Sequence, residues 1–141
     1  MKFQTAQEID VFVAMFEEWS LPASDWTHEA HIVVATWYLL HGELDTATNT
    51  IRKNIKAFNI AKGGKNTDTT GYHETITIFY MDYIHQLLAE VDPYLPNIEK
   101  VRYVLSSNLS NTHYVYQYYS KPKLLSKEAR LAFIPPDIKH W

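Results

Sequence analysis

The sequence predicts an all-α protein, a compact helical bundle of five to seven helices that forms a single domain over residues 1–141. Three observations lead to this fold class. Apolar residues recur at helical spacing in successive segments, no segment shows the alternation of a strand, and Gly or Pro residues separate the segments. A chain of 141 residues, 46% of them hydrophobic, is long enough to bury a full core as one domain.

Four helices are expected in the first ninety residues. Thr5 and Glu8 have the spacing of a capping box, and Gly42 follows the second apolar segment as a helix stop. A polar loop over residues 63–71 separates the third helix from the fourth. The expected bounds are about 5–19 for the first helix, 27–41 for the second, Asp45 or Thr46 to Gly63 for the third, and 72–90 for the fourth.

The C-terminal third is expected to contain shorter elements. The spacing predicts a fifth helix over about residues 97–107, a short sixth helix in NTHYVYQYYS at 111–120, and one or two further turns from Ser126. Two consecutive prolines then prevent a helix from continuing. We therefore expect the segment of about residues 120–141 to be largely extended or irregular and to pack on the bundle.

Composition and charge exclude several classes of function. Without Cys, the chain has no disulfides, no Cys-based zinc site and no thiol nucleophile. A net charge of −3 with mixed signs argues against nucleic acid as a partner, because such proteins present a basic patch. The longest apolar run, residues 32–40, is far below the roughly 20 residues of a membrane span. We expect a cytoplasmic protein with no membrane partner, whose ten Tyr and four Trp allow an apolar face for a homodimer.

Two histidine motifs stand where helices are expected to begin. THEAH, at residues 27–31, opens the second helix, and YHET, at residues 72–75, opens the fourth. Short connections make successive helices antiparallel neighbours, so that the second and fourth helices run in the same direction. Their N-terminal ends, and with them the two motifs, are therefore expected to lie at one end of the bundle.

The side chains of these motifs suit a metal or acid–base site. His28 and His31 are three residues apart and share a helix face, and His73 leads the apolar stripe of the fourth helix. The positive end of a helix dipole disfavours imidazolium and favours neutral imidazole, which is the form that binds metals. Three imidazoles suit zinc, iron, nickel or manganese as a divalent cofactor, with Glu74 as the catalytic general base on a bound water.

The predicted function is the binding of a small polar molecule in a pocket walled by Trp26, Tyr72 and Tyr80. Binding alone and binding followed by chemical transformation are both open, so the sequence does not decide whether the protein is an enzyme. One alternative is a non-catalytic module that binds a small molecule or anion at the two helix ends without a metal. Another is a purely structural bundle in which the polar residues only cap helices. In that case His73→Ala would cost about 1 kcal/mol and change nothing else.

Three stretches of the chain resemble a family of small, largely uncharacterised bacterial proteins. They are WTHEAH at residues 26–31, YHETIT at 72–77, and a late segment with YYS at 118–120, LSKEAR at 125–130 and PD at 136–137. The resemblance implies no particular activity, but it groups the histidine motifs and adds Arg130 and Asp137. It implies a structural role for these two residues, with the C-terminal segment folding over the site. The basic, aromatic end at residues 139–141 departs from the family pattern.

Overall fold

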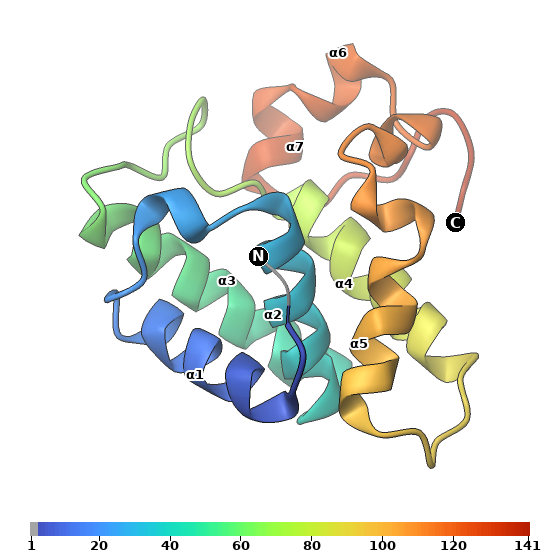
Figure 1. Cartoon of the computed structure of the whole chain (residues 1–141). Coiled ribbons are helices and arrows are strands. Elements are labelled where there is room, and N and C mark those ends of the chain that lie inside the picture. The colour runs from blue at the N-terminus through green and yellow to red at the C-terminus, as the bar shows by residue number, and fades with distance from the viewer. Residues whose placement is uncertain (1–2) are drawn as a thin grey trace.

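Helices account for all the regular structure in the part of the chain that the structure describes. The computed structural model describes residues 3–141, and no strand occurs in that range. The predicted all-α fold class is confirmed. The α-helices are α1 Ala6–Glu17, α2 His28–Leu40, α3 Leu44–Ala61, α4 Glu74–Ala89, α5 Asn97–Leu105, α6 Lys121–Leu124 and α7 Lys127–Leu131 (Figure 1). The short 3₁₀ turns are η1 Ala23–Asp25, η2 Asn108–Ser110 and η3 Tyr114–Gln117.

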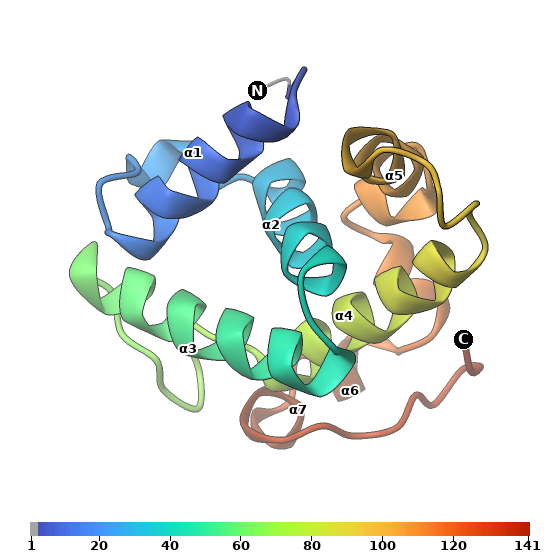
Figure 2. The same cartoon turned by 90° about the horizontal axis from the view of Figure 1, so that it is seen from below.

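Helix α2 is the central element of the fold. It contacts α1, α3, α4 and α5, which surround it in the view of Figure 2. Every residue from Ile32 to Trp37 is buried. A helix that is apolar on every face must be covered on every face, which explains this position. The side chains of the first turn of α2 therefore start from a backbone that is held on all sides.

One continuous apolar core joins the helices. Phe16 of α1, Val33 of α2, Phe58 of α3, Phe79 of α4 and Val104 of α5 belong to it, and each is at most 2% exposed. Burying a side chain of this size contributes about 1.5–3 kcal/mol. Within residues 3–141, no helix has both the length and the apolar character needed to cross a membrane.

Capping side chains set most of the helix starts. The hydroxyl of Thr5 accepts a hydrogen bond from the Glu8 amide at 3.1 Å, as the capping-box spacing predicted. The predicted start of the third helix was wrong, because α3 begins at Leu44 after Glu43, whose side chain makes no capping bond. Leu44 packs against the core, and the helix begins slightly earlier in the chain than expected.

The predicted sixth helix over residues 111–120 was also wrong. Only the single 3₁₀ turn η3 forms there, followed by the separate helix α6. The Asn111 side chain accepts from the His113 amide at 2.9 Å, and the Ser120 hydroxyl caps α6 by accepting from the Lys123 amide. Such local side-chain bonds compete with a continuous helix and limit it at both ends. In the segment of about residues 120–141, predicted to be largely extended or irregular, α7 matches the turn expected from Ser126, but α6 was not expected. Beyond α7 the chain is irregular and returns to the bundle through a hydrogen bond from the Trp141 indole to Asp82 at 2.8 Å.

Candidate functional site

The first turn of α2 lies against the N-terminal half of α4, and the two turns that carry the motifs border one cleft, as the topology predicted. The His28 ring meets the Tyr80 ring edge to face, with 5.5 Å between the centroids. A cleft opens here between α2, α3 and α4, in two parts that share His31, Ile55, Ile76 and Thr77. The inner compartment, of about 340 Å³, is lined by these four residues and by His28, Ile32, Ala35, Ile51, Tyr80 and Met81. The outer compartment, of about 490 Å³, is lined by the four shared residues and by Ala23, Trp26, Phe58, Asn59, Lys62, Gly64, Lys65, Thr70, Gly71, Tyr72 and His73.

His31 lies at the junction of the two compartments. Its Nδ1–H donates to the Thr27 carbonyl at 2.7 Å, which leaves Nε2 as the unprotonated nitrogen of the neutral ring. Burial lowers the pKa of His31 to about 4, against the opposing effect of the hydrogen bond to Thr27. The ring is therefore neutral near pH 7, and Nε2 has no partner among residues 3–141. His31 thus offers a lone pair at the wall of the cleft.

His28 is held in the same way by a distant part of the chain. Its Nε2–H donates at 2.8 Å to the carbonyl of Leu109, which lies in η2. Its Nδ1 has no partner within the described chain. The two histidines of the first motif thus each use one ring nitrogen for a backbone carbonyl, and the other nitrogen is uncommitted.

Both ring nitrogens of His73 are occupied. Nδ1 accepts from the Ile76 amide at 3.2 Å and so caps α4, while Nε2–H donates to the Leu124 carbonyl at 2.7 Å. The residue is only 8% exposed, and burial lowers the pKa of its ring. His73 lines the outer compartment. One ring nitrogen thus caps α4 and the other joins α4 to α6.

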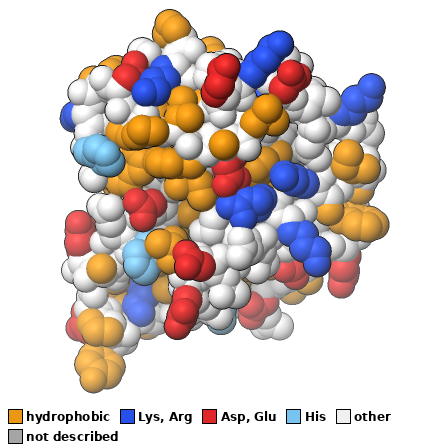
Figure 3. Space-filling view, turned by 180° about the vertical axis from the view of Figure 1, so that it is seen from behind, with side chains coloured by type: hydrophobic (Ala, Val, Ile, Leu, Met, Phe, Trp, Pro, Cys, Tyr) orange, Lys and Arg blue, Asp and Glu red, His pale blue; other side chains and the backbone are white. Residues whose placement is uncertain are grey.

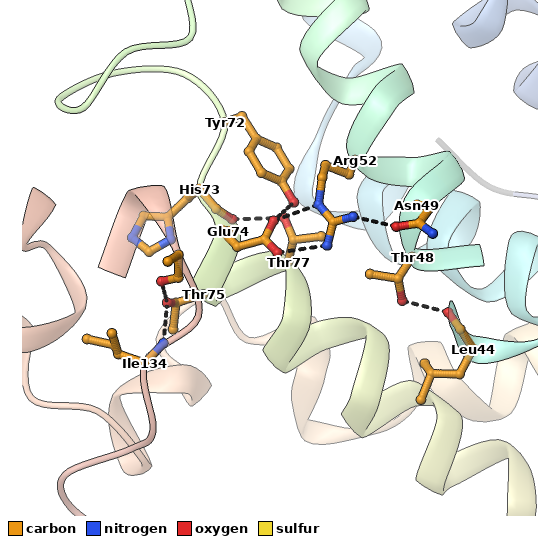
Figure 4. Close-up of polar contacts among 11 residues, drawn as sticks. Leu44, Thr48, Asn49, Arg52, Tyr72, His73, Glu74, Thr75, Thr77 and Ile134 are labelled. Atoms are coloured by element: carbon orange, nitrogen blue, oxygen red, sulfur yellow. Dashed lines mark hydrogen bonds and ion pairs between the residues drawn. The ribbon is translucent and has the colours of Figure 1, made fainter. Parts of the chain in front are cut away.

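Glu74 points to the other side of α4 from His73, as Figure 4 shows. Its two carboxylate oxygens accept from Nε and Nη2 of Arg52 at 2.8 and 2.7 Å, and Oε1 also accepts from the Tyr72 hydroxyl at 2.5 Å. Burial acts to raise the pKa of Glu74, but the hydrogen bonds from Arg52 and Tyr72 outweigh it and hold the pKa below its usual value. The carboxylate lines a separate pocket of about 240 Å³ and does not line the cleft.

The three aromatic residues predicted as pocket walls do line the cleft. Trp26 stacks between Phe16 and His31, with centroid distances of 4.1 and 3.9 Å, and its buried indole N–H has no acceptor within residues 3–141. Tyr72 uses its hydroxyl for Glu74. Burial raises the pKa of Tyr80 to about 12, so that its phenol is neutral at the wall of the inner compartment.

The four residues predicted as a metal and acid–base cluster are divided between different places. The cleft contains His28, His31 and His73, but Glu74 faces away from it. No group of three or more His, Asp or Glu side chains suited to a metal ion occurs in the described part of the chain. Metal binding stays a prediction from the sequence.

The loop over residues 63–71 forms a wall that the sequence did not identify as part of the site. Asn66 holds it: its Oδ1 accepts from the Tyr72 amide at 3.1 Å and from the Asn59 side chain at 3.0 Å. Its Nδ2 donates to the Lys56 carbonyl at 3.0 Å. Gly71 has a φ of +80°, and a Cβ there would lie 2.0 Å from the Lys65 carbonyl oxygen. The glycine-rich composition of the loop was the available signal.

The C-terminal segment covers the start of α4, where α7 lies in Figure 1. Arg130 donates to the Gly71 carbonyl at 2.7 Å, and Thr75 donates to the Ala132 carbonyl at 2.9 Å. Asp137 accepts from the Ser120 amide and hydroxyl. No residue of 120–141 lines either compartment. Arg130 and Asp137 therefore make structural contacts, but the segment does not fold over the cleft.

Comparison of the chain with family models, with curated proteins and with solved structures finds no match. The family resemblance stays a prediction.

Proposed function

We propose that the cleft binds a small organic molecule, which His28 and His31 hold by hydrogen bonds without chemical change. One observation carries the proposal: each of these rings is fixed through one nitrogen by a backbone carbonyl and has its second nitrogen uncommitted at the cleft wall. A mostly apolar cleft of several hundred cubic ångströms with a few convergent polar groups is typical of small-molecule sites.

Binding is better supported than catalysis because neither His31 nor Glu74 is suited to proton transfer in the cleft near pH 7. A general base works best when its pKa is close to the working pH, and the pKa of His31 is about 4. The Glu74 carboxylate is occupied by Arg52 and Tyr72 and lines another pocket. The remaining polar groups of the inner compartment are suited to orienting a ligand that carries an N–H or O–H donor.

Two probes of nearly equal shape test this proposal. Phenol carries the donor that the imidazoles require, and toluene does not. In NMR titrations of protein with ¹⁵N-labelled histidine, we expect phenol, more than toluene, to shift His28 Nδ1 and His31 Nε2. The phenol response should weaken in His28→Ala and His31→Ala but persist in His85→Ala, an exposed histidine of α4 that does not line the cleft. Equal responses to the two probes, or none, would contradict the proposal.

A divalent metal on the same two imidazoles is the second candidate. The observation that favours it is the carbonyl bonded to the far nitrogen of each ring, since metal-binding histidines usually donate their other N–H in this way. Against it, no Asp or Glu is among the residues that line the cleft to balance the added charge. Elemental analysis of untagged protein decides between a metal site and a metal-free ligand site. Near-stoichiometric metal that is lost in His28→Ala and His31→Ala, but kept in His85→Ala, would favour the metal site.

A further inference from the structure

We propose that the ligand of the cleft is a small organic acid, with its apolar body in the inner compartment and its carboxylate at Lys62 and Lys65 in the outer one. This inference rests on the proposed function and names the class of ligand. It follows from how charges and hydrogen-bonding groups are divided between the two compartments.

The cleft has positive charge and no negative charge. Lys62 and Lys65 line the outer compartment, and none of the residues that line either compartment is Asp or Glu. The composition makes this unexpected, since the chain has 16 acidic and 13 basic residues. On the face shown in Figure 3, acidic and basic side chains are mixed. Neither lysine takes part in an ion pair within residues 3–141.

The outer compartment also holds both lysines on supported backbone. The Lys62 ammonium lies 5.5 Å from the centroid of the Phe58 ring, which is part of the same wall. Lys65 stands between the Gly64 amide, which donates to the Asn59 carbonyl at 2.8 Å, and Asn66 with its three hydrogen bonds. This wall thus carries two cations that form no ion pair with the residues that the structure describes. These groups are all donors, which suits a ligand group with only acceptors, such as a carboxylate.

The inner compartment excludes the charged end of such a ligand. Its walls are mostly aliphatic, and its polar groups are the two imidazoles and the hydroxyls of Thr77 and Tyr80. A carboxylate placed there would lose its hydration without a cation in return, which is costly. An apolar body with a neutral donor for the imidazoles fits instead. Because the compartments adjoin at His31, one ligand reaches both.

Three probes that differ in the charge at one end test the inference by isothermal titration. They are 3-(4-hydroxyphenyl)propanoate, the corresponding neutral amide, and tyramine, which is a cation. Each has the phenol that the imidazoles are proposed to bind. We expect the propanoate to bind about tenfold more tightly than the amide, since two partly solvated ion pairs contribute that order of affinity, and tyramine to bind most weakly.

Matched variants assign the effect to the two lysines. Lys62→Met with Lys65→Met should remove the preference for the propanoate over the amide. Lys53→Met, at an exposed position of α3 outside the cleft, should leave this preference as it is. Lys53, Lys62 and Lys65 are all exposed, so the fold is expected to survive their replacement.

The outcomes separate this inference from the proposed function. If the amide and propanoate bind equally well, or the preference survives in the double variant, the organic-acid inference is wrong while the cleft still binds small molecules. If neither these probes nor phenol bind, the proposed function fails and the inference fails with it.

Discussion

Replacement of glycines by alanine tests how the wall of the cleft is built. Gly71 combines a φ of +80° with a Cβ position 2.0 Å from the Lys65 carbonyl oxygen. Gly63 has a φ of +87° but open space around its Cβ position. Gly42 has an ordinary φ, and its Cβ would lie 3.7 Å from the nearest atom, the Tyr38 carbonyl oxygen. The three positions thus separate the effect of backbone conformation from the effect of a steric clash.

The expected changes in the free energy of unfolding follow from these differences. Gly42→Ala should stabilise by about 0.4–1 kcal/mol, because alanine restricts the unfolded chain. In Gly63→Ala the alanine must also adopt the left-handed conformation, which costs about 1–2 kcal/mol. After the gain from the restricted unfolded chain is subtracted, we expect a net loss of about 0.5–1 kcal/mol. In Gly71→Ala the loop must also move and loosen the bonds of Asn66 and Arg130, each contributing about 1 kcal/mol, so we expect a loss of about 3 kcal/mol.

Urea unfolding, followed by far-ultraviolet circular dichroism, measures all three variants on the same scale. The decisive comparison is between Gly71→Ala and Gly63→Ala, which share the conformational cost and differ in the clash. If the two variants lose the same stability within about 0.5 kcal/mol, the close approach of residue 71 to the Lys65 carbonyl does not hold the wall, and the reasoning is refuted.

Two further changes test the histidine and glutamate environments. The pKa of His31 is about 4 in the folded protein and 6.5 ordinarily, so the unfolded chain binds more protons than the folded one between these two pH values. The free energy of unfolding that comes from the neutral ring is therefore complete above about pH 6.5 and falls by about 3 kcal/mol as the pH drops toward 4. Urea unfolding at several pH values should show this slope in the native protein and a weaker slope in His31→Gln. Glu74→Gln should cost about 1–3 kcal/mol by leaving the Arg52 guanidinium without its carboxylate. Phenol should still bind, with an affinity lowered only as far as the α4 wall shifts, because Glu74 does not line the cleft. A stable Glu74→Gln protein that no longer bound phenol would instead place Glu74 in the site.

The sequence was sufficient where the information was local. Periodicity located α1 to α5, and the hydroxyl of Thr27 caps α2 by accepting from the Ala30 amide at 3.2 Å, in agreement with the expected start. The short connections placed the first turns of α2 and α4 together. These successes share a cause: each depends on residues only a few positions apart, or on the order of helices along the chain.

The failures at the candidate site concern partners that are remote in sequence. The carbonyl that fixes His28 comes from Leu109, and the carbonyl that occupies His73 comes from Leu124. Every residue has a backbone carbonyl, so no pattern in the sequence indicates which carbonyl will accept a hydrogen bond from a given histidine. The pairing of Glu74 with Arg52 is equally hidden, since Arg52 lies on α3 among several polar residues. A cluster inferred from residue types therefore counted side chains whose bonding groups were already in use.

The adjacent residues His73 and Glu74 serve the site by positioning it. His73 caps α4 and ties it to the Leu124 carbonyl, on the side of the C-terminal segment. Glu74 ties the same turn to Arg52 of α3, on the opposite side. Since Ile76, Thr77 and Tyr80 follow within two turns and line the inner compartment, these two anchors set where the α4 wall of the cleft stands relative to α3. The His–Glu pair is thus explained by the need to hold a helix from both sides, and the uncommitted ring nitrogens belong to the histidines of the other motif.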